Sequence, residues 1–152
     1  MAQIRKLELE VAEVKCSATK FYGFYKNNIT QLVKCFPEIY KSVQVTEGDG
    51  ASVGSARLWK YGLDGLRHTL KERTVAVNDE SKSITWNFYG GELMNYYKSF
   101  GFKLVSVTPK GEGRCSVKWA VEFEKANEDV PSPTAYINLL DKITQGLPSQ
   151  LL

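Results

Sequence analysis

One segment near the end of the chain, residues 132–145, is the strongest long helix that the sequence predicts. Ser132 is a good helix N-cap, and Pro133 suits the first position of a helix. The apolar residues that follow have the i, i+3, i+4, i+7 spacing of a single helical face: Tyr136, Leu139, Leu140, Ile143 and Leu147. The Gly-Leu-Pro sequence at 146–148 predicts that this helix stops or kinks near Gln145.

Strands are predicted for almost all of residues 40–125, because short alternating runs are separated by turn residues. A glycine-rich hairpin loop is expected at 48–55 and another hairpin loop at 109–113. Short turns between successive strands predict an antiparallel meander. The six strands are expected at about residues 40–46, 55–61, 66–77, 84–88, 95–108 and 117–123.

The first part of the chain is predicted to contain one strand and two short helices. Alternating apolar and charged residues at 3–13 indicate a half-buried strand. Ser17 can cap a first helix, and Asn28 or Thr30 can cap a second helix that Pro37 ends.

These elements predict an α+β fold in a single domain, residues 1–152. A seven-stranded antiparallel sheet is expected to wrap around the long C-terminal helix, with two short helices between strands one and two. One helix cannot fill the concave face of so large a sheet. The function is therefore expected in the space between the helix and the sheet.

Charge and composition argue against several classes of function. The net charge of +3 is small and evenly spread, which argues against nucleic-acid binding. No apolar run approaches the roughly 20 residues of a membrane span, and Met1–Lys6 lacks the apolar core of a signal peptide. Three widely spaced cysteines and a single histidine, His68, argue against a zinc site or a disulfide framework. We therefore expect no metal, no cofactor, no membrane insertion and a reducing, cytoplasmic location.

Short runs of residues along nearly the whole chain are similar, and in the same order, to those of a known protein family: Phe21-Tyr22, Phe36-Pro37, Ser42–Val45, Glu47–Gly50, Val53–Tyr61, Lys71–Arg73, Gly91–Met94, Val107–Gly111 and Pro131–Ala135. The Gly-Ser-Ala-Arg-Leu-Trp-Lys-Tyr run at 54–61 is fairly specific. Together these runs resemble the plant major latex proteins, which belong to the birch-pollen-allergen (Bet v) superfamily.

The resemblance implies a helix-grip fold, similar to lipid-transfer START domains, with a large and mostly apolar cavity between sheet and helix. It also implies binding of sterols, fatty acids, hormones or flavonoid-like and alkaloid-like molecules. A few relatives in the superfamily catalyse cyclisations, condensations or isomerisations in specialised metabolism. In such proteins the final helix usually runs to the C-terminus, so a break at 146–148 would widen one mouth of the cavity.

Inward-facing side chains from most elements form the candidate ligand site: Tyr25, Leu58, His68, Leu70, Phe88, Tyr96, Tyr97, Phe100, Phe102, Trp119, Tyr136, Leu139, Leu140 and Ile143. We expect an internal cavity of roughly 300–1,000 Å³ or more among them, whereas a solid core is the alternative for any one residue. The loops 63–66 and 90–93 are expected to lie near the final helix and to control access. Gly90 and Gly91 should make the second loop easy to deform.

His68 is the candidate catalytic residue, with Tyr97 and Tyr136 as assistants. It alternates with Leu66 and Leu70, so it is predicted to face inward beneath the helix. There it could contact a ligand or act as a general acid or base. The alternative is a core histidine satisfied by a backbone carbonyl or a tyrosine.

The predicted function is binding or sequestration of an apolar small molecule, without a cofactor, by a monomer or weak dimer. The alternative is a cofactor-free cyclase or isomerase that folds a reactive terpenoid or alkaloid intermediate and transfers a proton. A protein–protein interaction module is a third option, but no exposed apolar motif supports it. Nucleotides are not expected as ligands, because the glycine-rich loop 48–55 lacks the Gly-Lys-Ser/Thr end of a phosphate-binding loop.

Overall fold

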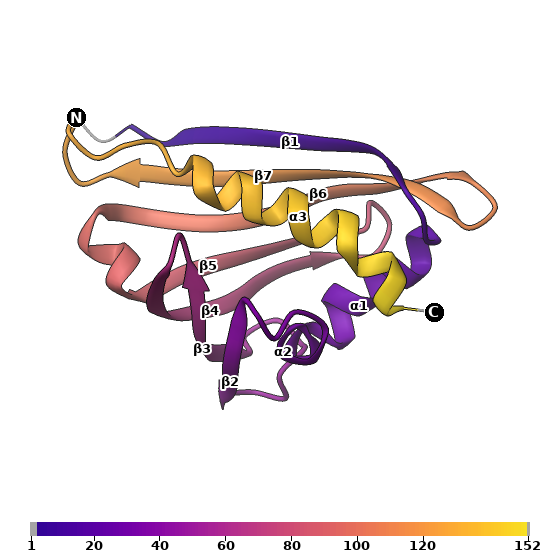
Figure 1. The fold of residues 1–152 in the computed structure, drawn as a ribbon, viewed down its shortest axis with the longest axis horizontal. Coiled ribbons are helices and arrows are strands. Elements are labelled where there is room, and N and C mark those ends of the chain that lie inside the picture. The colour runs from indigo at the N-terminus through magenta and orange to yellow at the C-terminus, as the bar shows by residue number, and fades with distance from the viewer. Residues whose placement is uncertain (1–2, 152) are drawn as a thin grey trace.

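A computed structural model describes residues 3–151, so the two ends of the expected domain 1–152 lie outside the described residues. Seven strands form one antiparallel sheet in the order β1-β7-β6-β5-β4-β3-β2 (Figure 1). The strands are β1 (Arg5–Val14), β2 (Tyr40–Glu47), β3 (Ala56–Leu63), β4 (Leu66–Asn78), β5 (Ser83–Gly91), β6 (Tyr97–Gly111) and β7 (Arg114–Lys125). The meander from β2 to β7 and the return of β1 beside β7 confirm the predicted sheet.

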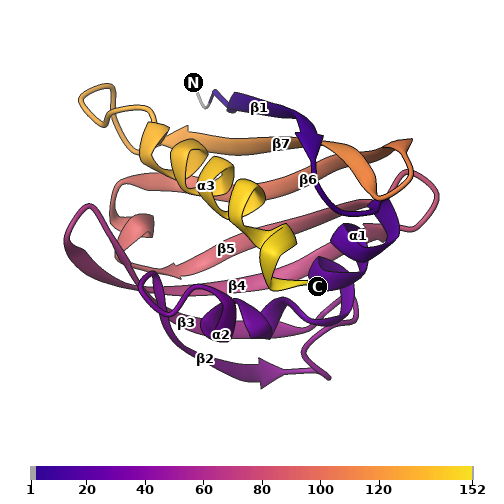
Figure 2. The same cartoon turned by 45° about the vertical axis from the view of Figure 1, so that its right-hand side comes forward.

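One long helix lies across the concave face of this sheet (Figures 1 and 2). Both views place the two short helices from the first half of the chain near the C-terminal end of this long helix. The helical elements are α1 (Ala18–Asn27), η1 (Ile29–Gln31), α2 (Leu32–Cys35), η2 (Glu92–Asn95) and α3 (Thr134–Gln150). The α+β helix-grip architecture is therefore as predicted. Among the described residues, none of these helices is long and apolar enough to cross a membrane.

The predicted end of α3 is wrong, because the helix continues through Gly146 and Pro148 to Gln150. Tertiary packing explains the difference. Leu147 is completely buried, and a Cβ on Gly146 would lie 3.1 Å from the Phe36 ring. The last turn thus fills the space above α2, and this burial outweighs the helix-breaking tendency of glycine and proline. The wider cavity mouth expected from a break does not form.

The predicted start of α3 also differs from the structure. Pro133 flanks the helix instead of opening it, and no side-chain cap forms there. The carbonyl of Ser132 accepts a hydrogen bond from the Thr134 amide at 2.8 Å, in a tight turn that takes Ser132 out of the capping position.

The predicted cap of the first short helix is confirmed, whereas the caps predicted for the second are wrong. Ser17 caps α1, because its hydroxyl accepts a hydrogen bond from the Lys20 amide at 3.1 Å. Neither Asn28 nor Thr30 caps the next helix through its side chain. Asn28 instead ends α1, its amide donating to the Phe24 carbonyl at 2.7 Å. The chain then makes the 3₁₀ turn η1 before α2 begins.

The hairpin between β6 and β7 is tighter than the loop predicted at 109–113. Strand β6 runs to Gly111 and pairs with Arg114 at the start of β7. Pro109 lies opposite Cys115, and the register shifts just after it. A local irregularity of this kind lets a strand accommodate a residue that has no amide hydrogen to donate.

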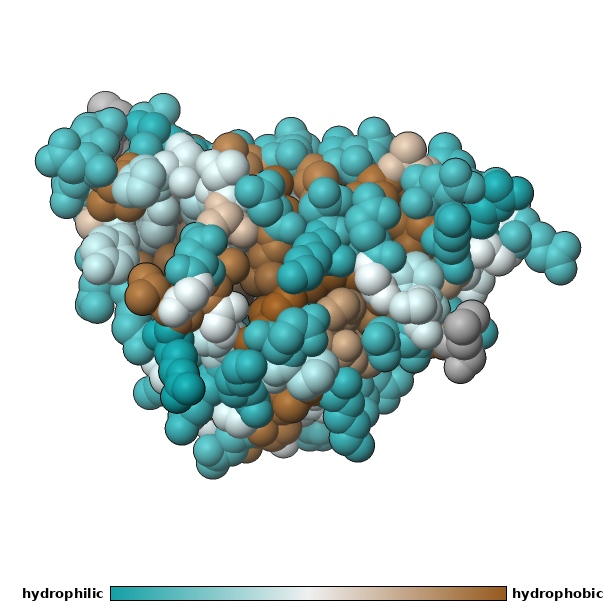
Figure 3. Space-filling model, in the orientation of Figure 1, coloured by the Kyte–Doolittle hydropathy of each residue, from teal (hydrophilic) through white to brown (hydrophobic). Residues whose placement is uncertain are grey.

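The core lies between α3 and the concave face of the sheet. Apolar residues gather at the centre of the face shown in Figure 3, and hydrophilic residues surround them. This distribution follows from the strand alternation, which turns one set of side chains toward the helix and the other toward water.

Candidate functional site

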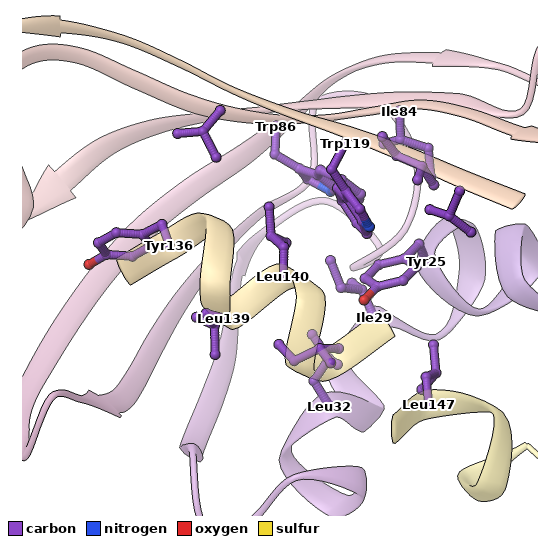
Figure 4. Close-up of a cluster of buried hydrophobic side chains, with 14 of the residues drawn as sticks. Tyr25, Ile29, Leu32, Ile84, Trp86, Trp119, Tyr136, Leu139, Leu140 and Leu147 are labelled. Carbon is purple, nitrogen blue, oxygen red and sulfur yellow. The ribbon is translucent and has the colours of Figure 1, made fainter. Parts of the chain in front are cut away.

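Two of the spaces lined by both α3 and the sheet contain most of the predicted ligand-site residues. We call the first the inner cavity; it has a volume of about 60 Å³. Its lining residues are Tyr25, Ile29, Leu32, Tyr40, Trp59, Leu70, Glu72, Trp86, Phe88, Phe102, Trp119, Leu140 and Ile143. Figure 4 shows Tyr25, Trp86 and Trp119 lying near Leu140 of α3, with Tyr136 at the N-terminal end of the same helix.

The inner cavity is small because aromatic rings fill most of the concave face. The rings of Trp86 and Trp119 stack with centroids 6.1 Å apart, and Tyr25 from α1 meets Trp119 edge-on at 5.1 Å. The internal volume predicted from the sequence, roughly 300–1,000 Å³, is therefore wrong. A solid aromatic core, which the sequence left open as the alternative for each residue, fills most of this region.

The second space is an open pocket of about 570 Å³, which we call the mouth pocket. The β3–β4 hairpin, η2 and the segment leading into α3 surround it. Its lining residues are Leu63, Asp64, Leu66, Arg67, His68, Glu92, Leu93, Tyr96, Tyr97, Val130, Pro131, Ser132, Pro133, Ala135 and Tyr136. The prediction that the loops 63–66 and 90–93 lie near the final helix is therefore confirmed.

Contrary to expectation, Gly90 and Gly91 are not in a loop that deforms easily. They end β5 opposite Lys71 and Leu70 of β4, and η2, which follows them, is hydrogen-bonded to β4. The Glu92 carboxylate accepts hydrogen bonds from the amide and the hydroxyl of Thr69 at 2.8 and 2.9 Å. These hydrogen bonds, led by the one from the amide, lower the pKa of Glu92 below its ordinary range. Gly91 has a φ of +104°, and a Cβ there would lie 2.1 Å from the Thr69 carbonyl oxygen.

Tyrosine hydroxyls are among the polar groups at or near the mouth pocket, which is also lined by Asp64, Arg67, His68, Glu92 and Ser132. The hydroxyls of Tyr61 and Tyr136 share a hydrogen bond of 2.6 Å, and the Tyr97 hydroxyl donates to the Pro131 carbonyl at 2.6 Å. Burial is the main cause that raises the pKa of each of these three phenols. They therefore stay protonated at neutral pH. The Tyr97 hydroxyl donates its one proton to Pro131, and one hydroxyl of the Tyr61–Tyr136 pair donates to the other, so these contacts leave one O–H of the pair to donate elsewhere.

His68 is half-buried and lines the mouth pocket. Its ring stacks on Tyr61 with centroids 5.3 Å apart and an interplanar angle of 30°. Within residues 3–151 no side-chain hydrogen bond involves this ring. The imidazole is thus positioned by stacking, and its nitrogens are available to a bound molecule.

The predicted ligand-site residues divide between the two spaces. Those at the inner cavity are Tyr25, Leu70, Phe88, Phe102, Trp119, Leu140 and Ile143. Those at the mouth pocket are His68, Tyr96, Tyr97 and Tyr136, so all three candidate catalytic residues lie in one pocket. Tyr96 is 57% exposed and belongs to the rim. Leu139 is buried and lines another pocket, whereas Phe100 is buried in the core and lines neither space.

The inward orientation predicted for Leu58 is wrong. Trp59 lines the inner cavity, and successive residues on a strand face opposite sides. The sequence analysis therefore missed Trp59, Tyr61 and Arg57, which share the inner face of β3. The aromatic residues at 59 and 61 were the available signal, because two large rings two positions apart indicate a buried face.

The comparison with protein families places the chain in a known group. Residues 2–152 match the family described as "Pathogenesis-related protein Bet v 1 family". Major latex protein 146 of Papaver somniferum is 42% identical over 149 residues, covering 97% of this chain and 91% of that protein. MLP-like protein 43 of Arabidopsis thaliana is 37% identical over 150 residues, covering 98% of this chain and 94% of that protein.

Solved structures show the same fold. The crystal structure of ginseng major latex-like protein 151 from Panax ginseng superposes with a TM-score of 0.91 at 30% identity, covering 98% of both chains. Norcoclaurine synthase from Thalictrum flavum, in complex with dopamine and hydroxybenzaldehyde, gives a TM-score of 0.76 at 18% identity, covering 97% of this chain and 88% of that one. That second likeness concerns the fold alone. The chain therefore belongs to the Bet v 1 family of pathogenesis-related proteins, and its similarity to major latex proteins extends over nearly its whole length.

Proposed function

We propose that this protein binds an apolar small molecule, such as a sterol, fatty acid, hormone or specialised metabolite, and carries or sequesters it. The observation that supports this function best is the mouth pocket. Its volume of about 570 Å³ lies within the roughly 300–1,000 Å³ usual for small-molecule sites. Most of its wall is apolar, and its polar groups come from tyrosine hydroxyls, His68, Ser132 and the charged side chains of Asp64, Arg67 and Glu92.

The rim of the mouth pocket has apolar surface that a ligand would cover. Leu66 at the tip of the β3–β4 hairpin is 63% exposed, and Tyr96 beside η2 is 57% exposed. Removing such surface from water stabilises a complex by about 25 cal/mol per Å² of apolar area. Exposed apolar groups that border a concave pocket are typical of ligand sites.

A binding measurement with a matched pair of variants tests this function. The neutral fluorescent probe N-phenyl-1-naphthylamine is titrated into the protein, and sterols, alkanols and hormones are then added as competitors. We expect saturable binding that Leu66→Glu weakens by at least about tenfold, because a charged group replaces apolar surface at the rim. The control is Val53→Glu, since Val53 is 58% exposed but lies outside the mouth pocket. Absence of saturable binding, or equal weakening by both variants, would reject the proposal.

A cofactor-free cyclase or isomerase is the second candidate function. The observation that favours it is that His68, Tyr97 and Tyr136 line the same pocket. His68 would move the proton, and the protonated phenols would hold a carbonyl or hydroxyl of the substrate. The pocket would hold a reactive terpenoid or alkaloid intermediate in one folded shape and exclude water from it.

A rate measurement separates the two functions. Candidate reactive intermediates are followed with and without protein, and the stereochemistry of the product is determined. An accelerated rate with one stereochemical product supports the enzyme, whereas binding without acceleration leaves the carrier function.

The setting of the protein is part of the same proposal. We place this chain, acting as one domain, in the cytosol as a monomer or weak dimer that takes no cofactor and does not bind nucleic acid. Three free thiols, on Cys16, Cys35 and Cys115, support a reducing compartment. Burial raises the pKa of Cys115 to about 12, so this thiol stays protonated and unreactive.

A further inference from the structure

A further pocket lies at the β3–β4 hairpin, next to the mouth pocket, and we call it the basic pocket. Its volume is about 420 Å³. Four charged side chains from four elements line it: Lys41 of β2, Lys60 of β3, Arg67 of β4 and Glu92 of η2. Three of these groups are cations and one is an anion, so the pocket carries a surplus of positive charge.

Two of the cations are carried on the outer face of the sheet, away from α3. Trp59 of β3 and Leu70 of β4 line the inner cavity, so their side chains mark the inner face of the two strands. Successive residues of a strand point to opposite faces. Lys60, one position after Trp59, and Arg67, three positions before Leu70, therefore point outward. The charged groups of the basic pocket thus do not belong to the apolar space beneath the helix.

The register of β3 and β4 brings these two cations close together. Lys60 pairs with Thr69, and Arg67 lies two positions before Thr69 on the same strand. Lys60 and Arg67 are therefore diagonal neighbours on one face, about 7–8 Å apart, within reach of long side chains. Gly62, which pairs with Arg67, has no side chain, so nothing from β3 covers the face opposite Arg67. Both cations can therefore contact one bound molecule.

The cations of the basic pocket lack the carboxylate partners that most arginines of this protein have. Within residues 3–151, none of Lys41, Lys60 and Arg67 forms a salt bridge. Arg73, further along β4, differs, because its guanidinium donates to the Glu47 carboxylate at 2.7 Å. Unpaired like charges that line one concave surface repel each other and attract an anion from solution.

Hydrogen bonds hold the other two charged groups of the basic pocket in place. The Lys41 ammonium donates to the carbonyls of Pro37 and Glu38 at 2.9 and 3.2 Å, and an ammonium has a third N–H that these contacts do not use. The Glu92 carboxylate accepts from the amide and the hydroxyl of Thr69. The one anion of the pocket is thus attached to β4, whereas its cations keep donors for a ligand.

We propose that the basic pocket binds a phosphate monoester group. Such a group carries about two negative charges at neutral pH, which match the surplus charge of the pocket. The Arg67 guanidinium can donate two parallel hydrogen bonds to its oxygens, and the two lysines add point charges. The group can belong to a soluble metabolite or to the headgroup of phosphatidic acid, because its chemistry is the same in both. This site is independent of the proposed binding of apolar molecules.

Two binding measurements at constant ionic strength test the site and identify the source of the phosphate. In the first, glucose 6-phosphate is added to the full chain, and amide chemical shifts are followed by NMR. We expect saturable shifts at Lys60, Arg67 and Thr69, weaker binding of glucose 6-sulfate, which has less negative charge, and no shifts with glucose. In the second, the protein is sedimented with phosphatidylcholine vesicles that contain phosphatidic acid. Binding in neither measurement would overturn the proposal.

Matched variants separate a specific site from general attraction to a basic protein. We expect Arg67→Gln to weaken the binding of whichever phosphate source binds by at least about tenfold, the effect of losing hydrogen bonds between charged groups. Arg67→Lys should weaken it less, because the charge remains. The control is Lys110→Gln, which removes one charge from an exposed position outside the basic pocket and should leave binding unchanged. Equal weakening by Arg67→Gln and Lys110→Gln would overturn the proposal, and the NMR spectra establish that each variant is folded.

Discussion

Arg57 and Glu72 face each other directly across β3 and β4, and both side chains are buried in the inner layer of the protein. The guanidinium of Arg57 donates twice to the carboxylate, with Nη2 lying 2.9 Å from Oε2. The same guanidinium donates to the Gly50 carbonyl at 2.9 Å and to the Thr74 hydroxyl at 2.7 Å. This ion pair thus links the glycine-rich loop to the wall of the inner cavity.

Breaking this pair should strongly destabilise the fold. We expect Arg57→Met to lower the free energy of unfolding by about 3–5 kcal/mol, because it leaves the Glu72 charge buried without a partner. Urea unfolding measures the effect. The control is Arg114→Met, which removes the salt bridge to Glu13. The side chains of Arg114 and Glu13 are 58% and 56% exposed, so this variant should hardly shift the midpoint of urea unfolding. A similar small shift in both variants would contradict the structural role of the buried pair.

Gly91 should tolerate substitution much less well than its neighbour. We expect Gly91→Ala to lower the free energy of unfolding by more than about 1 kcal/mol, because its φ of +104° and the nearby Thr69 carbonyl exclude a Cβ. In Gly90→Ala the new methyl group meets only the flexible side chain of Lys71, so the loss should be smaller. Thermal unfolding of both variants measures the difference. Equal losses would show that this backbone is freer than the structure indicates.

The attachment of η2 to β4 should weaken in acid. The hydrogen bonds from Thr69 lower the pKa of Glu92 below its ordinary value of 4.5. Their contribution to stability is therefore complete above pH 4.5 and is lost as the pH falls through the lower pKa of the folded state. The amide chemical shift of Thr69, followed by NMR, should therefore titrate with a midpoint below 4.5. Glu92→Gln should abolish this titration. A midpoint at or above the ordinary value would mean that the carboxylate is not bound in solution.

If the protein is an enzyme, His68 should be needed for turnover. We expect His68→Ala to lower the rate by at least roughly 100-fold, the lower range for a placed proton-transfer group, while the protein stays folded. Free imidazole should restore part of the rate, because the variant leaves a ring-sized space beside Tyr61. His68→Phe keeps the stacking but not the proton transfer, so it should stay inactive. Unchanged turnover and product stereochemistry in the folded variants would reduce His68 to a packing role.

The order and type of the elements were predictable from the sequence because they depend on local patterns. The apolar face from Tyr136 to Leu147 predicts α3 regardless of what the helix packs against. All five apolar residues of this face are buried in the structure. Alternation on β5 and β7 likewise predicts the buried rings of Trp86 and Trp119. The resemblance to major latex proteins added the helix-grip topology, which no single element specifies.

The tertiary structure alone decided where α3 ends and how much space lies beneath it. Gly146 and Pro148 stay helical because burial of Leu147 and packing against the Phe36 ring stabilise that turn. Phe36 is distant from this turn in the sequence, so local patterns cannot reveal the contact. Whether facing rings fill a concave sheet depends on the angle at which each side chain crosses the core. The inward face of β3, the contact between Tyr61 and Tyr136, and the division into two spaces follow from that packing. Local spacing can predict which side chains are apolar, but their three-dimensional fit determines whether they enclose a cavity or close it.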